Sequence, residues 1–592
     1  MKITILPDSV RLNPVTLRLF EHQPTLYKRT LPEDYQNDNP VWNQHDKVIR
    51  LKSAANETVA FQAVLFFDEP LEIEQIKLLP LNGPETIPES SIELFKEWFV
   101  DVQVPSSGYE KTSFGSGWYP DALIPLDARH QDWGLPFHLP DYWNRIPGQK
   151  ACIIWADIYV PRHYPAGNYR STLTIQAKGR APITLPVELS VWPFSLPDKN
   201  NLRGNLYTNT FRSFSLEKEL RYQHAFKKHR LAAHQCYYRP HLTIQDNDPV
   251  LDWTDFDKRL TKYFNGSAFT AKYGYTGPGE GEPIEFFLLP FNCSGKKNAV
   301  GWPLPTTGHH DDTFWKIWDK TAHAVRQHLI DEKRIDLKKT ETQIFFNSLD
   351  ECYDRADHER MITWATFLKK HFPECPFRID GGYDDATMDF LSSHVDLCLY
   401  HTVAYDYPFV KKFRDKGIRD WIYGPVVYES KTNELTGAST FIDLDLLTMR
   451  GLAWTVYKYG ADTWCQWEFA SENKQAWFNP ENFKNNDLAD FRCYNGNGML
   501  LYDGEFLNLP DPCISIRFKA GRSGAQEFEY LKLYESLGGN AMAFVDALID
   551  KPFGPNAIGN LEPWNPDISA WDKARLALGN AIANKIINYL KH

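Results

Sequence analysis

The chain has 592 residues, 43% of them hydrophobic and 24% charged, which predicts two or three globular domains and excludes a disordered protein. A formal net charge of −11, without any run of Lys and Arg, excludes a nucleic-acid-binding role. No apolar stretch is long enough to cross a membrane, so we expect no membrane partner.

The first part of the chain reads as short β-strands separated by Pro, Gly and Asn. The runs TVAFQAVLFF, KACIIWADIYVP, GNYRSTLTIQA and ITLPVELSVWPF are rich in β-branched and aromatic residues. They predict an antiparallel β-sandwich over residues 1–198. Pro161, Pro165 and Gly167 predict a hairpin that links Tyr159 to Tyr169, and SLPDKNN at 195–201 reads as a linker.

After residue 198 the sequence pattern changes and predicts strands that alternate with helices. The helical stretch 311–329 places Phe314, Trp318 and Val325 on one face at a period of 3.6 residues. This alternation predicts a (β/α)8 TIM barrel over residues 199–497, so the expected fold class is multidomain α/β. Its candidate strands lie at 205–211, 234–240, 284–291, 342–351, 377–383, 395–402, 420–426 and 462–469.

A C-terminal extension over residues 498–592 completes the predicted organisation. Helical stretches around 523–549 and 568–590 carry apolar residues that would pack on the barrel. Nine scattered cysteines, with no zinc-type spacing, favour free buried thiols. The start MKITILPDSVRLNP has no apolar signal core, so we expect a cytoplasmic protein; a removed leader would instead make it periplasmic or secreted.

The fourth predicted barrel strand delivers two adjacent carboxylates, Asp350 and Glu351. Catalytic residues of such barrels lie at the carboxyl ends of the strands, and glycoside cleavage needs a carboxylic acid to protonate the leaving oxygen. Adjacent carboxylates suit substrate-assisted hydrolysis, in which the 2-acetamido oxygen of the sugar is the nucleophile. Asp350 would orient the acetamide and Glu351 would be the general acid and base. The alternative is that both merely cap the following helix.

Four stretches give the chain a resemblance to a known family. They are WADIYVPRHYPAGNYRSTLTI, KKHRLAAHQ, FFNSLDE, and NGNGMLLYDG with CISIRFKAGRSGAQEFEYLKLYE. Over roughly residues 140–540 the chain resembles glycoside hydrolase family 123, barrel enzymes with an N-terminal sandwich. The resemblance implies a retaining exo-β-N-acetylgalactosaminidase whose substrate ends in an N-acetylhexosamine. It also implies that Asp350 and Glu351 are the catalytic pair.

The remaining site residues are inferred from their places at the ends of predicted strands. Tyr400 or Tyr423 would supply a hydroxyl donor to the acetamide oxygen, and each has the alternative of a barrel-wall aromatic. Trp467 would stack on the sugar ring while Glu468 binds its hydroxyls. Further candidates to line the pocket are Arg212, His234, Asp380, Tyr383 and His401.

Metal and cofactor motifs do not emerge from the sequence. The run His309-His310-Asp311-Asp312 reads as a helix start rather than a metal site, because adjacent side chains diverge. Two alternatives to the leading function stay open. One is a glycosidase for another sugar with a carboxylate nucleophile, and the other is a non-catalytic carbohydrate-binding protein.

Overall fold

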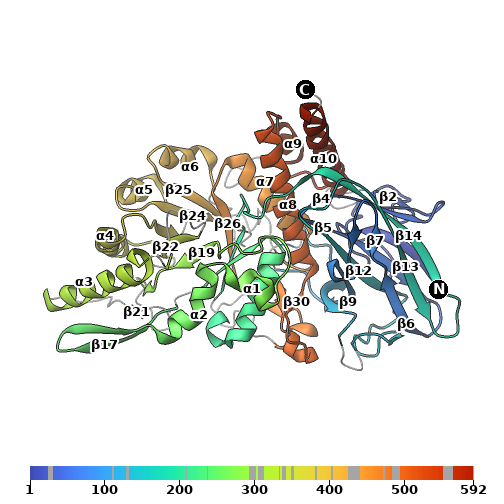
Figure 1. Cartoon of the computed structure of the whole chain (residues 1–592), viewed down its shortest axis with the longest axis horizontal. Coiled ribbons are helices and arrows are strands. Elements are labelled where there is room, and N and C mark those ends of the chain that lie inside the picture. The colour runs from blue at the N-terminus through green and yellow to red at the C-terminus, as the bar shows by residue number, and fades with distance from the viewer. Residues whose placement is uncertain are drawn as a thin grey trace.

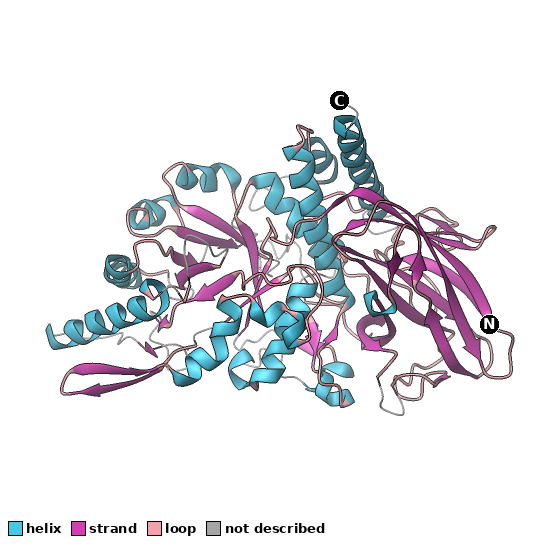
Figure 2. Cartoon of the chain, in the orientation of Figure 1, coloured by secondary structure: helices cyan, strands magenta, loops and turns pink. Residues whose placement is uncertain are grey.

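The computed structural model consists of a β-rich N-terminal part, a ring of parallel strands surrounded by helices, and C-terminal helices at their junction (Figure 1). Figure 2 shows that helices gather around the ring and the junction, whereas the N-terminal part is almost entirely strands. The multidomain α/β architecture with N-terminal sheets is confirmed. The structure describes residues 1–590 except 25–30, 108, 110–111, 129–132, 209, 236–237, 293–301, 304–311, 333, 336–341, 348–352, 381–382, 402–404, 425–439, 471–473, 483–493 and 551–563.

Two stacked sheets form the N-terminal part. A buried apolar cluster that includes Phe61, Ile154 and Val187 lies between them, because alternate residues of each strand face inward. The first sheet has the order β1 (Lys2–Pro7), β5 (Glu57–Phe66), β12 (Ala151–Val160), β9 (Ile92–Val102) and β10 (Gly117–Pro125). The second has the order β11 (Phe137–Leu139), β6 (Leu71–Leu78), β13 (Gly167–Ala177), β14 (Ile183–Ser195), β4 (Val48–Ala55), β3 (Trp42–Asn43) and β2 (Asp38–Asn39), with β7 (Leu81–Asn82) and β8 (Thr86–Ile87) beside β13.

Two details of the sandwich prediction are wrong. The expected hairpin between Tyr159 and Tyr169 does not form, because β12 pairs with β5 and β9 whereas β13 pairs with β14 and β6. The connection at 161–166 therefore crosses from one sheet to the other. The sandwich is also not purely antiparallel, since β14 and β4 pair in parallel.

All eight strands expected after residue 199 are present, most of them shorter than predicted, and the structure pairs them in a closed ring of parallel neighbours. Their order is β15 (Asn205–Thr208), β16 (Ala232–Gln235), β19 (Phe286–Leu288), β22 (Gln343–Asn347), β23 (Phe377–Asp380), β24 (Leu397–His401), β25 (Arg419–Tyr423) and β26 (Thr463–Trp467). The second strand begins two residues before its predicted start. An unpredicted hairpin, β17 (His241–Gln245) with β18 (Asp248–Asp252), follows β16.

Helices follow the ring strands along the chain. The predicted apolar face of α3 is confirmed, with Trp318, Thr321 and Val325 buried. Among the described residues, no helix is both long and apolar enough to cross a bilayer. The helices are α1 (Leu216–Lys228), α2 (Thr254–Phe264), α3 (Asp312–Arg326), α4 (Arg355–His371), α5 (Asp385–Leu391), α6 (Tyr407–Arg414), α7 (Leu447–Tyr459), α8 (Ile516–Ser536), α9 (Met542–Leu548) and α10 (Ile568–Leu590).

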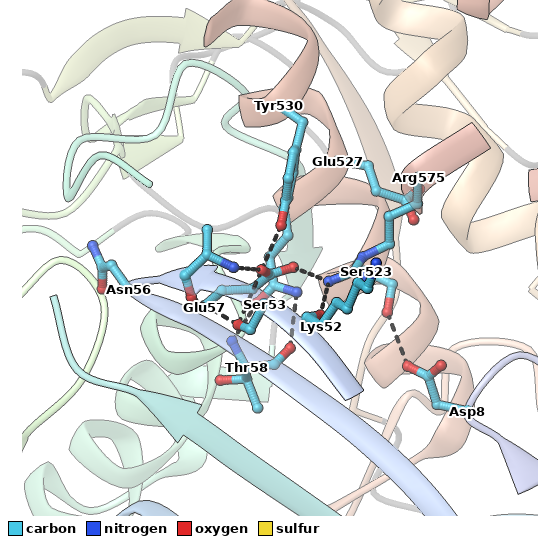
Figure 3. Close-up of polar contacts among 12 residues, drawn as sticks. Asp8, Lys52, Ser53, Asn56, Glu57, Thr58, Ser523, Glu527, Tyr530 and Arg575 are labelled. Atoms are coloured by element: carbon cyan, nitrogen blue, oxygen red, sulfur yellow. Dashed lines mark hydrogen bonds and ion pairs between the residues drawn. The ribbon is translucent and has the colours of Figure 1, made fainter. Parts of the chain in front are cut away.

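Helix α8 joins the ring to the sandwich through buried polar contacts. Glu57 of β5 accepts hydrogen bonds from the Tyr530 hydroxyl and the Arg575 guanidinium, at 2.6 Å each (Figure 3). Asp157 of β12 accepts from Lys519 at 2.6 Å and from Arg522 at 2.7 and 2.8 Å. Burial acts to raise the pKa of Asp157, but these two cations hold it well below its usual range.

The predicted free thiols are confirmed where the structure describes them. Cys152, Cys375, Cys398, Cys465 and Cys513 are all buried and unpaired by disulfides.

Candidate active site

The inside of the ring is closed by an aromatic layer. Trp421 of β25 meets Phe286 and Phe345 edge to face, with ring centroids 5.4 and 5.3 Å apart. These rings belong to one buried cluster with Leu397 and Leu399 of β24. The layer is a packed floor, and the candidate site residues lie at the carboxyl ends of the strands, where catalytic groups of such barrels are found.

Arg378 of β23 lies over this floor. Its guanidinium carbon is 5.1 Å from the Phe345 ring centre and 5.3 Å from that of Trp421. Its Nε is 3.0 Å from Oδ1 of Asp380, and the two side chains are 3% and 14% exposed. A buried ion pair is strong only when its geometry is good. The Arg378 guanidinium fixes the orientation of the Asp380 carboxylate. The structure thus places Asp380 on the inner side of the ring.

His401 and Tyr423 lie side by side at the ends of β24 and β25. The two residues are paired across the strands, and their ring centroids are 5.0 Å apart. Tyr423 packs against the same inner cluster as Trp421, because residues two apart on a strand face the same side. His401 is 8% exposed. The end of the ring near β23, β24 and β25 therefore presents a carboxylate, an imidazole and a phenol.

Two predicted tyrosines lie elsewhere. Tyr400 packs against Tyr405 and Phe409, each with centroids 6.1 Å away, and so faces α6 outside the ring. Its alternation with Leu399 and His401 puts it on the opposite face of β24. Tyr383 donates its hydroxyl to the backbone oxygen of Asp380, the last residue of β23, at 2.8 Å. The structure does not bring either residue to the inner floor.

Glu468 follows β26 and is 7% exposed. Gly498 lies against it: a Cβ on Gly498 would stand 3.3 Å from the Glu468 Cβ. Three other predicted residues have a described backbone only, with Arg212 in the turn Thr210–Ser213, His234 in β16 and Trp467 in β26. Asp350 and Glu351 lie outside the described residues, and β22 ends at Asn347.

Sequence reasoning missed Arg378. The signal was present, because an Arg two residues before Asp380 in a strand must face the same side as that Asp. Nothing in the sequence said that this side was the interior of the ring.

The comparisons with known proteins bear on this arrangement. Residues 294–534 match the family of the glycoside hydrolase 123 catalytic domain. That range contains β22 to β26 and the segment Asp350-Glu351. Over this range the chain is similar to the catalytic domain of glycoside hydrolase family 123. No curated protein sequence matches it.

The chain also has similar solved structures. A family 123 glycoside hydrolase from Clostridium perfringens, described in work on glycolipid glycan hydrolysis, superimposes with a TM-score of 0.62 at 12% identity, covering 100% of this chain and 98% of that one. A family 39 glycoside hydrolase from Bacteroides cellulosilyticus WH2 reaches a TM-score of only 0.32 at 11% identity, covering 77% and 82%. The first likeness establishes a shared fold. The chain is a glycoside hydrolase, and its substrate is a carbohydrate.

Proposed function

We propose that this chain is a family 123 enzyme, a retaining exo-β-N-acetylgalactosaminidase that uses the 2-acetamido group of its own substrate as nucleophile. The observation that carries the proposal is the position of β22 in the ring. Asp350 and Glu351 follow its last residue, Asn347, by three and four positions, and the neighbouring strand β23 ends in Asp380. Carboxyl ends of neighbouring parallel strands meet on one side of a ring, so the pair would act beside Asp380.

The reaction would run in two balanced steps. In the first, the acetamide oxygen bonds to the anomeric carbon as the bond to the leaving oxygen breaks, and Glu351 gives that oxygen its proton. Asp350 holds the acetamide N–H and stabilises the positive charge on the oxazoline-type ring. In the second, Glu351 takes a proton from water, the water oxygen bonds to the anomeric carbon and the acetamide is released. Two inversions give net retention.

Other side chains would bind the sugar around this pair. Tyr423 is the tyrosine that we propose as donor to the acetamide oxygen, because it packs on the inner cluster whereas Tyr400 faces α6. Asp380, oriented by Arg378, and His401 would accept or donate hydrogen bonds to sugar hydroxyls. The same proposal keeps Trp467 as stacking platform, with Glu468, Arg212 and His234 as further sugar contacts.

The architecture supports a division of labour. Each ring strand is followed along the chain by a helix, from α1 after β15 to α8 after β26, which suits a catalytic (β/α)8 barrel over residues 199–497. Residues 1–198 and 498–592 would support this barrel rather than carry the reaction.

The test is initial-rate hydrolysis of p-nitrophenyl glycosides of β-GalNAc, β-GlcNAc, β-galactose and β-glucose. Wild type would be compared with Glu351→Gln and with Glu359→Gln, a control in α4 whose side chain is 63% exposed. We expect turnover of 2-acetamido sugars only, lost in Glu351→Gln and retained in Glu359→Gln. Turnover of plain galactosides would refute the substrate-assisted mechanism. Glycan binding without turnover would instead identify a carbohydrate-binding protein.

A further inference from the structure

We infer that Arg517 of α8 is a positioning residue for the reaction, through which the sandwich sets the shape of the site. The inference rests on the proposed function for its activity readout. Arg517 binds two chain segments at once, those that lead from β25 and from β26 into the helices that follow. We call these segments loop 7, residues 440–446, and loop 8, residues 494–502.

Arg517 uses its whole guanidinium group for this purpose. Nε and Nη2 donate to the two carboxylate oxygens of Asp121 in β10, at 2.8 Å each. Nη1 donates to the backbone oxygens of Thr440 in loop 7 and Gly496 in loop 8, and Nη2 also donates to that of Met499. The five N–H groups thus have five acceptors, and the side chain is 2% exposed. Lysine, with three donors on one nitrogen, cannot reproduce this fork.

Both loops lie against the end of β26. The Gln466 amide of β26 donates to the Thr440 hydroxyl at 2.9 Å. The backbone N–H groups of Leu500 and Leu501 both donate to the backbone oxygen of Phe469, at 2.9 and 3.0 Å. Because Gly498 also lies against Glu468, a shift of loop 8 moves the wall beside a proposed sugar contact.

The sandwich holds the same loops at a second point. Asp443 of loop 7 is fully buried and accepts from the hydroxyls of Ser106 and Ser113, at 2.6 Å each. Asn495 of loop 8 donates to the Ser106 hydroxyl at 3.1 Å. The Arg11 guanidinium donates to the backbone oxygens of Ile442 and Leu444 in loop 7, at 2.6 Å each. The sandwich and α8 therefore support loops 7 and 8 in addition to the contacts that the loops make with β26.

Arg522 offers a matched control on the same helix. It is 2% exposed, and its guanidinium also donates twice to a sandwich carboxylate, that of Asp157. Among the described residues, the side-chain hydrogen bonds of Arg522 go to Asp157 and not to loop 7 or loop 8. A Lys at either position weakens the contact between α8 and the sandwich, but only Arg517→Lys removes donors that bind backbone oxygens of the two loops.

The experiment compares wild type, Arg517→Lys and Arg522→Lys by thermal unfolding, by kinetics on p-nitrophenyl β-GalNAc, and by hydrogen exchange of peptides that cover the two loops. We expect similar losses of Tm in both variants. We expect kcat to fall about 10- to 100-fold in Arg517→Lys alone, with little change in KM, because sub-ångström misplacement is costly in catalysis. Exchange in loops 7 and 8 should rise in Arg517→Lys only.

Equal kcat in the two variants, with equal loop exchange, would overturn the inference. If wild type hydrolyses no glycoside, the proposed function fails, and the exchange comparison alone decides whether Arg517 positions the loops. If Arg517→Lys does not fold, Asp121→Asn takes its place, since it weakens the anchor but leaves the three backbone acceptors. It should raise loop exchange and lower kcat by a smaller factor, and unchanged values would count against the inference.

Discussion

Two glycines of α8 lead to a sharp prediction about stability. A Cβ at Gly524 would stand 2.5 Å from the backbone oxygen of Arg450 and 3.0 Å from its Cα, so Gly524→Ala must displace the backbone of α7. A Cβ at Gly521 would meet only the ends of two flexible side chains, Met449 Cε at 3.1 Å and Leu231 Cδ1 at 3.2 Å. The two positions differ in what resists the added methyl group.

The magnitudes follow from opposing effects. Alanine is favoured over glycine inside a helix by about 1 kcal/mol, and overpacking a rigid contact costs about 1–3 kcal/mol. Moving α7 also disturbs the buried contact between Arg450 Nε and the two carboxylate oxygens of Glu527, at 3.0 Å each. We therefore expect Gly524→Ala to lower the free energy of unfolding by about 1–2 kcal/mol and Gly521→Ala to leave it unchanged or slightly raised.

Thermal unfolding followed by circular dichroism, with all three proteins at one concentration and pH, measures this difference. The Tm of Gly521→Ala should equal or slightly exceed that of wild type, and the Tm of Gly524→Ala should lie below both. A Gly524→Ala protein as stable as Gly521→Ala would refute the reasoning, because it would mean that the backbone of α7 yields as readily as a methionine side chain.

Three further changes have defined outcomes. Burial and the nearby Asp572 raise the pKa of Asp8 from 3.8 to about 6, so the folded state loses stability as the pH rises through that range. Each unit of pKa difference between the folded and unfolded states corresponds to about 1.4 kcal/mol, so Asp8→Asn should stabilise the protein by up to about 3 kcal/mol at pH 7.5 and by less than about 1 kcal/mol at pH 4. A stability gain in thermal unfolding that does not depend on pH would contradict this. Asp157→Asn leaves two buried cations with a neutral partner and should cost about 3–5 kcal/mol, which a Tm close to that of wild type would exclude. Tyr423→Phe should lower kcat on 2-acetamido glycosides about 100-fold without changing Tm, and an unaffected kcat would return Tyr423 to the role of a wall residue.

Much of the fold could be predicted from local patterns of apolar residues and turn residues in the sequence. The ring strands are short apolar runs that end at turn residues, and α3 shows its buried face in the spacing of Trp318 and Val325. The assignment of β12 and β13 to different sheets could not be predicted, since a six-residue connection with two prolines, followed by Gly167, also suits a hairpin. Pairing between sheets depends on long-range contacts that leave no local mark.

The candidate site also contains residues that the sequence predicts and residues that only the structure identifies. Asp380 could be predicted because it ends a strand, whereas its partner Arg378 could be recognised only once the inner face of β23 was known. Tyr400 and Tyr423 look alike in sequence, each close to the end of a strand. The packing of the strands distinguishes them. Leu399 belongs to the inner cluster, so the next residue, Tyr400, faces the other side of β24, whereas Tyr423 packs against that cluster. Likewise, no local signal pairs Arg517 with Asp121, which lies 396 residues earlier.

The contacts between the start and the end of the chain bear on the order of its synthesis. Ser9 donates to Asp572 at 2.8 Å, and Glu57 accepts from Arg575 on the same helix, α10. Synthesis has therefore to pass residue 575 before Ser9 and Glu57 can both meet these partners. Until then the face of the first sheet that carries Glu57 lacks its partner from α10. We expect nascent chains that stop before α10 to expose this face and to be recognised as unfinished.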